Sequence, residues 1–235
     1  MVSRKANSSS RGSVEGAAKA DERSDRGGSR LGAARAKRVR PPLDQAGLHD
    51  LALAYVARFA TTGARLEAYL RRKLRERGSA EETESGPPVD IPALVSRMIA
   101  LGYVDDEAYA RMRSRDLSER GFGARRIEQA LWAAGVGEDV RTDHAPAEAG
   151  SRRAAVQFAR KRRLGPFAVS LDEPGEEYAQ RHKAREKAVA AMLRAGHDFA
   201  HARFVLEAAE ITELEQWVAE AEESERGDTG DASTW

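Results

Sequence analysis

One candidate ligand-binding motif in this sequence is a pair of glycines that flank a phenylalanine, Gly121-Phe122-Gly123. They could present free backbone amides to a phosphate, because a helix N-terminus carries unpaired donors and partial positive charge. A dinucleotide-binding loop also needs a preceding strand and a third small residue. Here a helical pattern precedes the glycines, and Arg126 stands at the third position. We therefore interpret Gly121 as the left-handed end of one helix and Gly123 as a tight turn into the next.

Two histidines four residues apart, His197 and His201, have the spacing that places two zinc ligands on one helical face. Gly196 precedes them and Asp198 is a typical N-cap residue, so we expect His197 to lie outside the following helix. No third ligand stands out nearby. We interpret the spacing as chance on a solvated face, and no metal site is predicted.

Paired carboxylates are the remaining chemical candidates, as at Asp105/Asp106 and Glu176/Glu177. Both pairs stand where helices are expected to start, and the helix dipole favours acids there. A serine nucleophile elbow and a P-loop are missing from the sequence, and the lack of cysteine excludes disulfides, thiolate metal sites and cysteine nucleophiles. The sequence therefore predicts no catalytic residue, no cofactor site and a protein that is not an enzyme.

The composition favours a helix-rich chain with much surface and little core. Of the 235 residues, 41% are hydrophobic and 33% are charged, which is apolar-poor for a compact globule. No apolar run approaches the roughly 18 residues of a membrane helix, and the N-terminus lacks the apolar core of a signal peptide. We therefore expect a cytoplasmic protein.

Apolar residues recur at helical spacing from Leu48 onward, and no segment shows the sustained alternation of a strand. The first pattern continues to Phe59, and a second covers about 63–77. Asp90 can cap a third helix, with Ile99 on its apolar side. The sequence therefore predicts an all-α chain.

Three of the expected helices end on one pattern, in which two apolar residues and a glycine follow each other at intervals of four. The copies are Leu70-x3-Leu74-x3-Gly78, Ile127-x3-Leu131-x3-Gly135 and Ala188-x3-Met192-x3-Gly196. Three divergent copies of a three-helix unit would give this spacing. One unit buries its apolar face poorly alone, so the copies should pack in a row.

We therefore predict an elongated tandem array of three three-helix repeats between two tails. The repeats are assigned to residues 43–104, 105–147 and 148–210. A disordered basic arm is expected over 1–42, and an acidic tail, helical at its start and then disordered, over 211–235. The acidic tail could screen basic faces of the repeats or only keep the protein soluble, and we favour the second.

Basic residues gather in each repeat on helical faces opposite the apolar ones. A solvated charged face explains any one cluster, but the recurrence in all three repeats favours a polyanionic or acidic extended partner. On charge density alone, the predicted partner-binding residues are Arg71, Arg72, Arg75, Arg111, Arg115, Arg125, Arg126, Arg160, Lys161, Arg162 and Arg185.

Three blocks of this sequence, taken in order, resemble the regulatory protein RecX family, whose members modulate the RecA recombinase. The blocks are GYVDDEAYA from Gly102, RGFGARRIEQALWAAGV from Arg120 and KAVAAMLRAGHDFAHARFVLEA from Lys187. The resemblance runs from about Leu48 to Ala209. The chain departs from the family pattern at His197, where an aromatic residue is usual, in the inserted SAEETESGPP and in both tails.

The resemblance implies tandem three-helix repeats in a curved, elongated shape that lies in the helical groove of the RecA filament on single-stranded DNA. There the protein would hinder ATP hydrolysis and strand exchange or block filament growth, in DNA recombination, repair and the SOS response. We expect a monomer, with direct DNA contact possible. The alternative is a helical protein that binds DNA through its arginines and acts without RecA.

Overall fold

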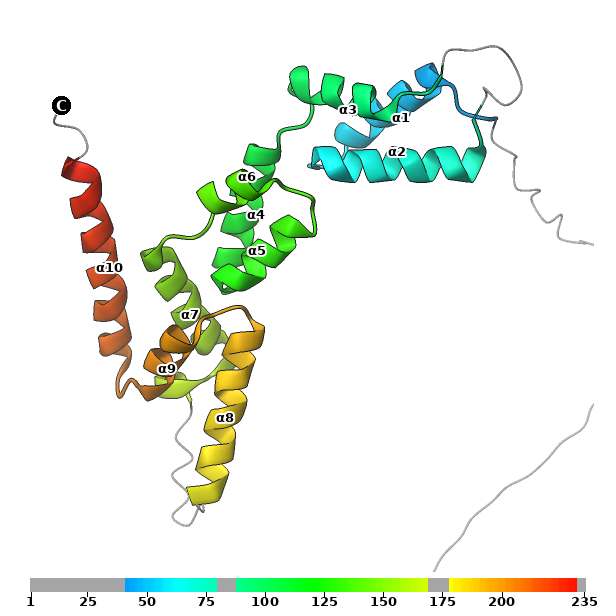
Figure 1. The fold of residues 1–235 in the computed structure, drawn as a ribbon. Helices are drawn as coiled ribbons and strands as arrows, with labels where there is room; N and C mark the ends of the chain where they lie inside the picture. The colour runs from blue at the N-terminus through cyan, green and yellow to red at the C-terminus, as the bar shows by residue number, and fades with distance from the viewer. Residues whose placement is uncertain (1–40, 80–87, 169–177, 232–235) are drawn as a thin grey trace, which may run out of the picture. The chain divides into compact units, whose positions relative to one another are not determined.

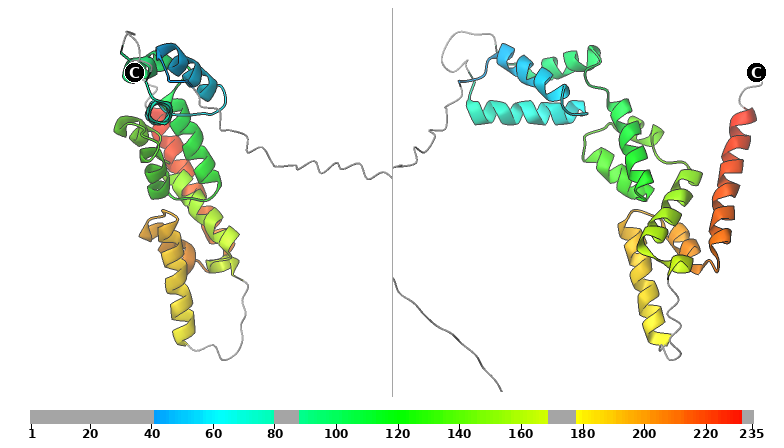
Figure 2. Two further views of the ribbon diagram at one scale, coloured as in Figure 1. Left: turned by 90° about the vertical axis from the view of Figure 1, so that its right-hand side faces the viewer. Right: turned by 180° about the vertical axis from the view of Figure 1, so that it is seen from behind.

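The computed structural model describes residues 41–79, 88–168 and 178–231 (Figure 1). Within these ranges the chain forms helices and no strand, and the one β-type pairing is an isolated bridge between Leu43 and Ser79. Figure 2 shows the same helices from two further sides. The predicted all-α class is confirmed. Most of the expected basic arm, residues 1–40, lies outside the described residues.

The first module is a group of three helices around its own apolar cluster. The helices are α1 (Gln45–Val56), α2 (Gly63–Arg77) and α3 (Ile91–Ala100). Each begins at a residue whose side chain accepts a hydrogen bond from a first-turn amide, namely Asp44, Thr62 and Asp90. The side chains with no exposed surface in this cluster are Leu48, Ala52, Leu66, Leu70 and Met98.

The second module repeats this arrangement with α4 (Asp106–Glu119), α5 (Ala124–Trp132) and the short α6 (Glu138–Asp143). Asp105 caps α4 by accepting from the amide of Ala108 at 2.8 Å. Gly121 has a φ of 87° and closes α4, as the sequence predicted. The cluster of this module includes Tyr109, Leu117, Ile127, Leu131 and Val136.

The third module contains one more helix than the sequence predicted. Its elements are α7 (Glu148–Arg162), the 3-10 turn η2 (Gly165–Phe167), α8 (Tyr178–Arg194), α9 (Phe199–Glu207) and α10 (Ile211–Asp231). The segment expected as an acidic tail with a helical start is thus helical through Asp231, and its last residues, 232–235, lie outside the described residues. Leu214, Trp217 and Ala221 form an apolar stripe on α10 that is buried in the cluster of the third module.

Two residues expected on apolar helix faces are exposed instead. Helix α1 ends at Val56, so Phe59 falls in the connection that follows and is 55% exposed. Ile99 lies in the last turn of α3, beyond the cluster, where its Cδ1 reaches toward Gly63 at the start of α2. The apolar spacing in the sequence thus extends a few residues beyond the part of α1 and of α3 that packs against the cluster.

The first and second modules meet where the start of α2 contacts the end of α5. The hydroxyl of Thr62 donates to the carbonyl of Ala134 at 2.5 Å. The amide of Gly63 donates to the carboxylate of Asp106 at 2.9 Å. A Cβ at Gly135 would lie 2.3 Å from the Cβ of Ala64, so only glycine fits there.

The second and third modules meet in the same way, where the start of α5 contacts the end of α8. The amide of Gly123 donates to the carbonyl of Ala195 at 3.0 Å, and the amide of Arg125 donates to Gly196 at 3.2 Å. These amides would be unpaired at an isolated helix start. The carbonyls of Ala195 and Gly196, which follow α8, therefore occupy the place where a phosphate would bind the Gly121-Phe122-Gly123 loop.

Gly123 adopts an extended backbone with φ −79°, so its role differs from the turn that the sequence predicted. A Cβ at this position would lie 2.3 Å from the carbonyl carbon and oxygen of Gly196 and 2.4 Å from the amide of His197. Glycine is required there because two backbones touch.

His197 and His201 are 2% and 8% exposed, so the expectation of a solvated face was wrong. Asp198 caps α9, and His197 lies before the helix as predicted. The ring of His197 packs 5.5 Å from that of Phe158, and its Nε2 lies 3.1 Å from the carbonyl of Gly121. Since a carbonyl only accepts, Nε2 carries the proton in this bond.

We predict that Gly123→Ala destabilises the protein by about 2 kcal/mol or more, because the added methyl meets backbone atoms that cannot rotate away. Urea unfolding monitored by circular dichroism measures the change. The control is Gly150→Ala within α7, where the nearest atom to the added Cβ is Pro146 at 3.7 Å. This variant should be unchanged or up to about 1 kcal/mol more stable. Equal stabilities of the two variants would contradict the account of the junction.

We predict that His197 makes the folded protein sensitive to acid. Burial lowers the pKa of His197 despite its bond to Gly121, so the unfolded chain takes up a proton first as pH falls. The stability due to this group is complete above pH about 6.5 and is lost below it, by up to about 1.4 kcal/mol at pH 5.5.

Urea unfolding of His197→Phe at pH 7.5 and 5.5 should show a smaller loss of stability on acidification than the wild type. Substitution of the exposed His182 by glutamine should leave the wild-type loss unchanged. The same loss in His197→Phe as in the wild type would exclude His197 as its source.

Candidate partner-binding surface

All eleven predicted partner-binding residues lie exposed on the helices that the sequence predicted for them. Arg71, Arg72 and Arg75 lie on α2, Arg111 and Arg115 on α4, and Arg125 and Arg126 on α5. Arg160, Lys161 and Arg162 lie on the last turn of α7, and Arg185 lies on α8. All of these charged groups are accessible to solvent, but only some of them already contact a carboxylate or carbonyl of the same chain.

Five of the eleven already face a carboxylate. Within single helices the pairs are Arg71–Glu67, Arg72–Glu76 and Arg115–Glu119, and between helices they are Arg160–Glu215 and Arg185–Glu207. Pairs between exposed residues contribute little to stability and are screened by salt. A partner can therefore compete for these guanidinium groups, but it must first displace an internal carboxylate.

Four of the eleven have no ion pair, side-chain hydrogen bond or ring contact in the described part of the chain. They are Arg75, Arg111, Arg125 and Arg126. A guanidinium group without a carboxylate is free to make a charge-assisted, two-pronged bond to a carboxylate or phosphate of a partner. Arg125 and Arg126 are adjacent in the first turn of α5, so they form the densest unpaired charge of the second module.

An exposed tryptophan extends this charge along α5. Trp132 is 69% exposed, the largest exposed fraction of any large hydrophobic residue that the structure describes. It lies seven residues after Arg125, with the exposed Gln129 between them, so the three share one helical face. Tryptophan and arginine are the residues most often found at the centre of protein interfaces. The charge argument from the sequence missed Trp132, although the spacing Arg125-Gln129-Trp132 could have identified it.

Two residues at the end of α7 have structural contacts that the sequence did not predict. The ammonium group of Lys161 lies 3.3 Å from the carbonyl of Glu119 and 3.2 Å from that of Arg120, at the end of α4. The guanidinium group of Arg162 lies over the ring of Phe158 at 5.7 Å. Lys161 thus helps to join the second and third modules.

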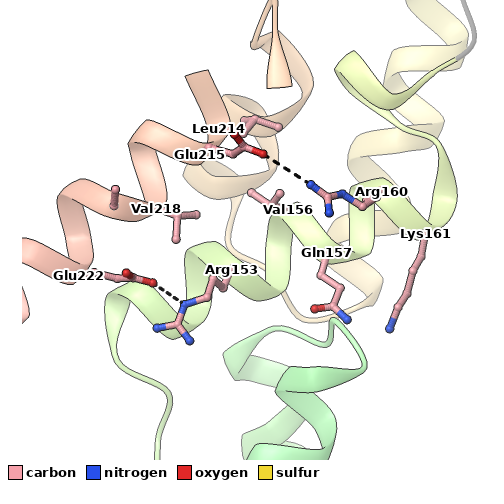
Figure 3. Close-up of a pocket in the computed structure, with 10 residues that line it drawn as sticks. Arg153, Val156, Gln157, Arg160, Lys161, Leu214, Glu215, Val218 and Glu222 are labelled. Carbon is pink, nitrogen blue, oxygen red and sulfur yellow. Dashed lines mark ion pairs between the residues drawn. The ribbon is translucent and has the colours of Figure 1, made fainter. Parts of the chain in front are cut away.

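A groove of about 560 Å³ lies between α7 and α10 (Figure 3). Val156, Leu214 and Val218 supply apolar side chains to it. Two ion pairs cross from α7 to α10 in Figure 3, Arg153–Glu222 at 2.9 Å and Arg160–Glu215 at 3.9 Å. Arg153 was not among the predicted residues, and its partner Glu222 lies in the segment expected as an acidic tail.

A polar network fixes the start of α7 against α9 and α10. Partial burial raises the pKa of the Glu148 carboxyl, but hydrogen bonds from Arg152 and His201 outweigh it and lower the pKa below its usual range. The other ring nitrogen of His201 lies 3.1 Å from Asp198, and its ring meets Trp217 edge-on. In the residues that the structure describes, no group of three or more His, Asp or Glu side chains could hold a metal ion.

The Glu207 carboxylate on α9 accepts hydrogen bonds from Arg203 of the same helix and from Arg185 of α8. A hydrogen bond from Arg203 lowers the pKa of Glu207, and Arg185 acts in the same direction. Arg185 is therefore less available to a partner than Arg125 or Arg126.

Throughout 41–79, 88–168 and 178–231, every helix is too short or too polar to span a bilayer.

Comparison with known proteins identifies relatives across most of the chain. Residues 105–143 match the family model described as RecX, second three-helix domain. The regulatory protein RecX of Myxococcus xanthus is 34% identical over 164 residues, which cover 68% of this chain and 84% of that protein. The regulatory protein RecX of Thermus thermophilus is 37% identical over 89 residues, 38% of this chain and 56% of that protein.

Solved structures show the same fold. The crystal structure of RecX from Lactobacillus salivarius matches with a TM-score of 0.51 and 17% identity, and the match covers 73% of this chain and 96% of that one. A second RecX crystal structure matches with the same TM-score and 20% identity, over 70% and 73% of the two chains. At these identities the likeness concerns the fold alone.

Proposed function

This chain belongs to the regulatory protein RecX family, and on that basis we propose that it regulates the RecA recombinase by binding the filament that RecA forms on single-stranded DNA. Binding would inhibit ATP hydrolysis and strand exchange, and so act on DNA recombination, repair and the SOS response. The relatives are named as regulatory proteins, which agrees with a regulator and not an enzyme. We propose a cytoplasmic monomer without a cofactor.

The observation that carries this proposal is the exposed face of α5, where Arg125, Gln129 and Trp132 follow each other. Two arginines without counter-ions and a largely exposed tryptophan supply charge attraction and an apolar anchor on one rigid element. The backbone contacts at both ends of α5 hold this face in the middle of three joined modules. Contacts on the outer modules then add to it through effective concentration.

The alternative function is direct DNA binding without RecA. Four of the predicted residues that have no counter-ion, Arg75, Arg111, Arg125 and Arg126, could contact phosphates instead of protein carboxylates. Such binding would weaken steeply with salt and would not require a protein partner. The two functions differ in whether RecA is needed.

We predict that the protein inhibits DNA-stimulated ATP hydrolysis by RecA at amounts well below saturation of the DNA. In Arg125→Ala/Arg126→Ala, half-inhibition should need about tenfold more protein, equivalent to about 1.4 kcal/mol of lost binding. The control Arg58→Ala/Arg97→Ala removes the same charge from exposed arginines outside the predicted set. If the control loses inhibition to the same extent, net charge alone explains the effect. If neither variant loses inhibition, the arginines of α5 do not contribute to the interface.

We predict that affinity for naked single-stranded DNA is much lower than affinity for the RecA filament on the same DNA. Fluorescence anisotropy of a labelled oligonucleotide over 50–200 mM salt, with and without RecA, measures both. Tight binding to naked DNA with unchanged RecA hydrolysis would establish the alternative function instead.

A further inference from the structure

Helix α10 lies antiparallel to α7, and acidic residues of α10 face basic residues of α7 at a regular interval. Glu215 pairs with Arg160, and Glu222 pairs with Arg153, so the two pairs are seven residues apart on both helices. Farther along, the carboxylate of Glu225 accepts from the amide of Ala149 at 2.7 Å, in the first turn of α7. An acidic helix thus follows a basic one for about two turns, as Figure 3 shows for the two ion pairs.

Among the described side chains of α10, those of residues 211–227, the buried apolar ones lie in the first half of the helix. Its buried residues are Leu214, Trp217 and Ala221, and Arg152 both lies over the Trp217 ring and donates to the Trp217 carbonyl at 2.7 Å. From Glu222 to Gly227 no side chain is buried, and polar contacts hold the helix to α7. Such contacts are weak at exposed positions and are screened by salt.

An open groove lies on the side of the α7–α10 contact where the two ion pairs cross. Its volume of about 560 Å³ is bordered by Val156 of α7 and by Leu214 and Val218 of α10. The α7–α10 contact therefore has two sides, one buried in the cluster of the third module and one polar and open to solvent.

We propose that the face of α7 beneath α10, formed by Arg152, Arg153, Val156 and Arg160, is a docking surface for an acidic amphipathic helix of a partner protein. In the free protein α10 occupies this surface as an internal ligand that the partner helix displaces. The proposal does not require that the partner is RecA.

The chemistry of the occupant follows from α10 itself. An occupant needs an apolar side chain to cover Val156 and carboxylates seven residues apart to reach Arg153 and Arg160, which Leu214, Glu215 and Glu222 provide. Nucleic-acid phosphates could pair with the two arginines but would leave Val156 and the adjoining cluster uncovered. An acidic helix of a protein satisfies both requirements.

The test uses a fluorescein-labelled peptide with the sequence of residues 210–227 and the full chain as receptor. The wild type should bind it weakly, because the tethered α10 competes at a high effective concentration. The variant Glu215→Gln/Glu222→Gln removes both carboxylates from the internal helix and keeps its apolar stripe. It should bind the peptide at least about fivefold more tightly than the wild type in fluorescence anisotropy.

The control variant Glu220→Gln/Glu223→Gln removes the same charge from exposed positions of α10 and should bind like the wild type. Amide hydrogen exchange over α10 should also accelerate in Glu215→Gln/Glu222→Gln and not in the control. The proposal is overturned if neither variant binds the peptide more tightly, or if both do so equally. It is also overturned if Glu215→Gln/Glu222→Gln gains affinity for a single-stranded oligonucleotide and none for the peptide.

Discussion

Contact between the start of one helix and the glycine-terminated end of another holds each module to the next, and the rest of the structure depends on it. The start of α5 donates two amide hydrogen bonds to carbonyls at the end of α8, while the end of α5 accepts from Thr62 at the start of α2. Amides and carbonyls that a lone helix leaves unpaired are thus paired between modules, and the helix dipoles meet with opposite signs. Gly123, Gly135 and Gly196 permit the approach, because a Cβ at any of them would lie within 2.4 Å of the facing module.

The helices and their repeat could be predicted because both arise from local patterns. Apolar spacing and capping residues such as Asp90 and Asp105 determine where helices lie, and the recurring glycines Gly78, Gly135 and Gly196 revealed a repeated unit. The reason for the glycines could not be predicted, since residues 123 and 196 meet only in the folded chain. The same holds for α10. Its stripe Leu214-Trp217-Ala221 is visible in the sequence, but strong acidity led us to expect a tail, and only the α7 face it covers explains the stripe.

Charge density along the sequence predicted which residues are exposed. It could not predict which of them are free of contacts within the chain and so available to a partner. All eleven predicted residues are exposed, yet Arg160 and Arg185 face carboxylates from other helices and Lys161 contacts carbonyls of the second module. The positions of those partners depend on tertiary packing, which residue types alone do not reveal. What remains accessible without competition is concentrated on α5, the helix that the two junctions hold at both ends. The element that joins the modules is therefore also the one that presents the most available charge.

The central claim is that hydrogen bonds to backbone amides and carbonyls at helix ends join the modules, and amide hydrogen exchange followed by NMR tests it most directly at the junction of α5 with the end of α8. The amides of Gly123 and Arg125 have acceptors only in the third module, whereas the amide of Ala124 between them has no acceptor in the described part of the chain. The account predicts that Gly123 and Arg125 exchange at least about a hundredfold more slowly than Ala124, as expected for amides released only by subglobal opening. Exchange of all three at the same fast rate would contradict it.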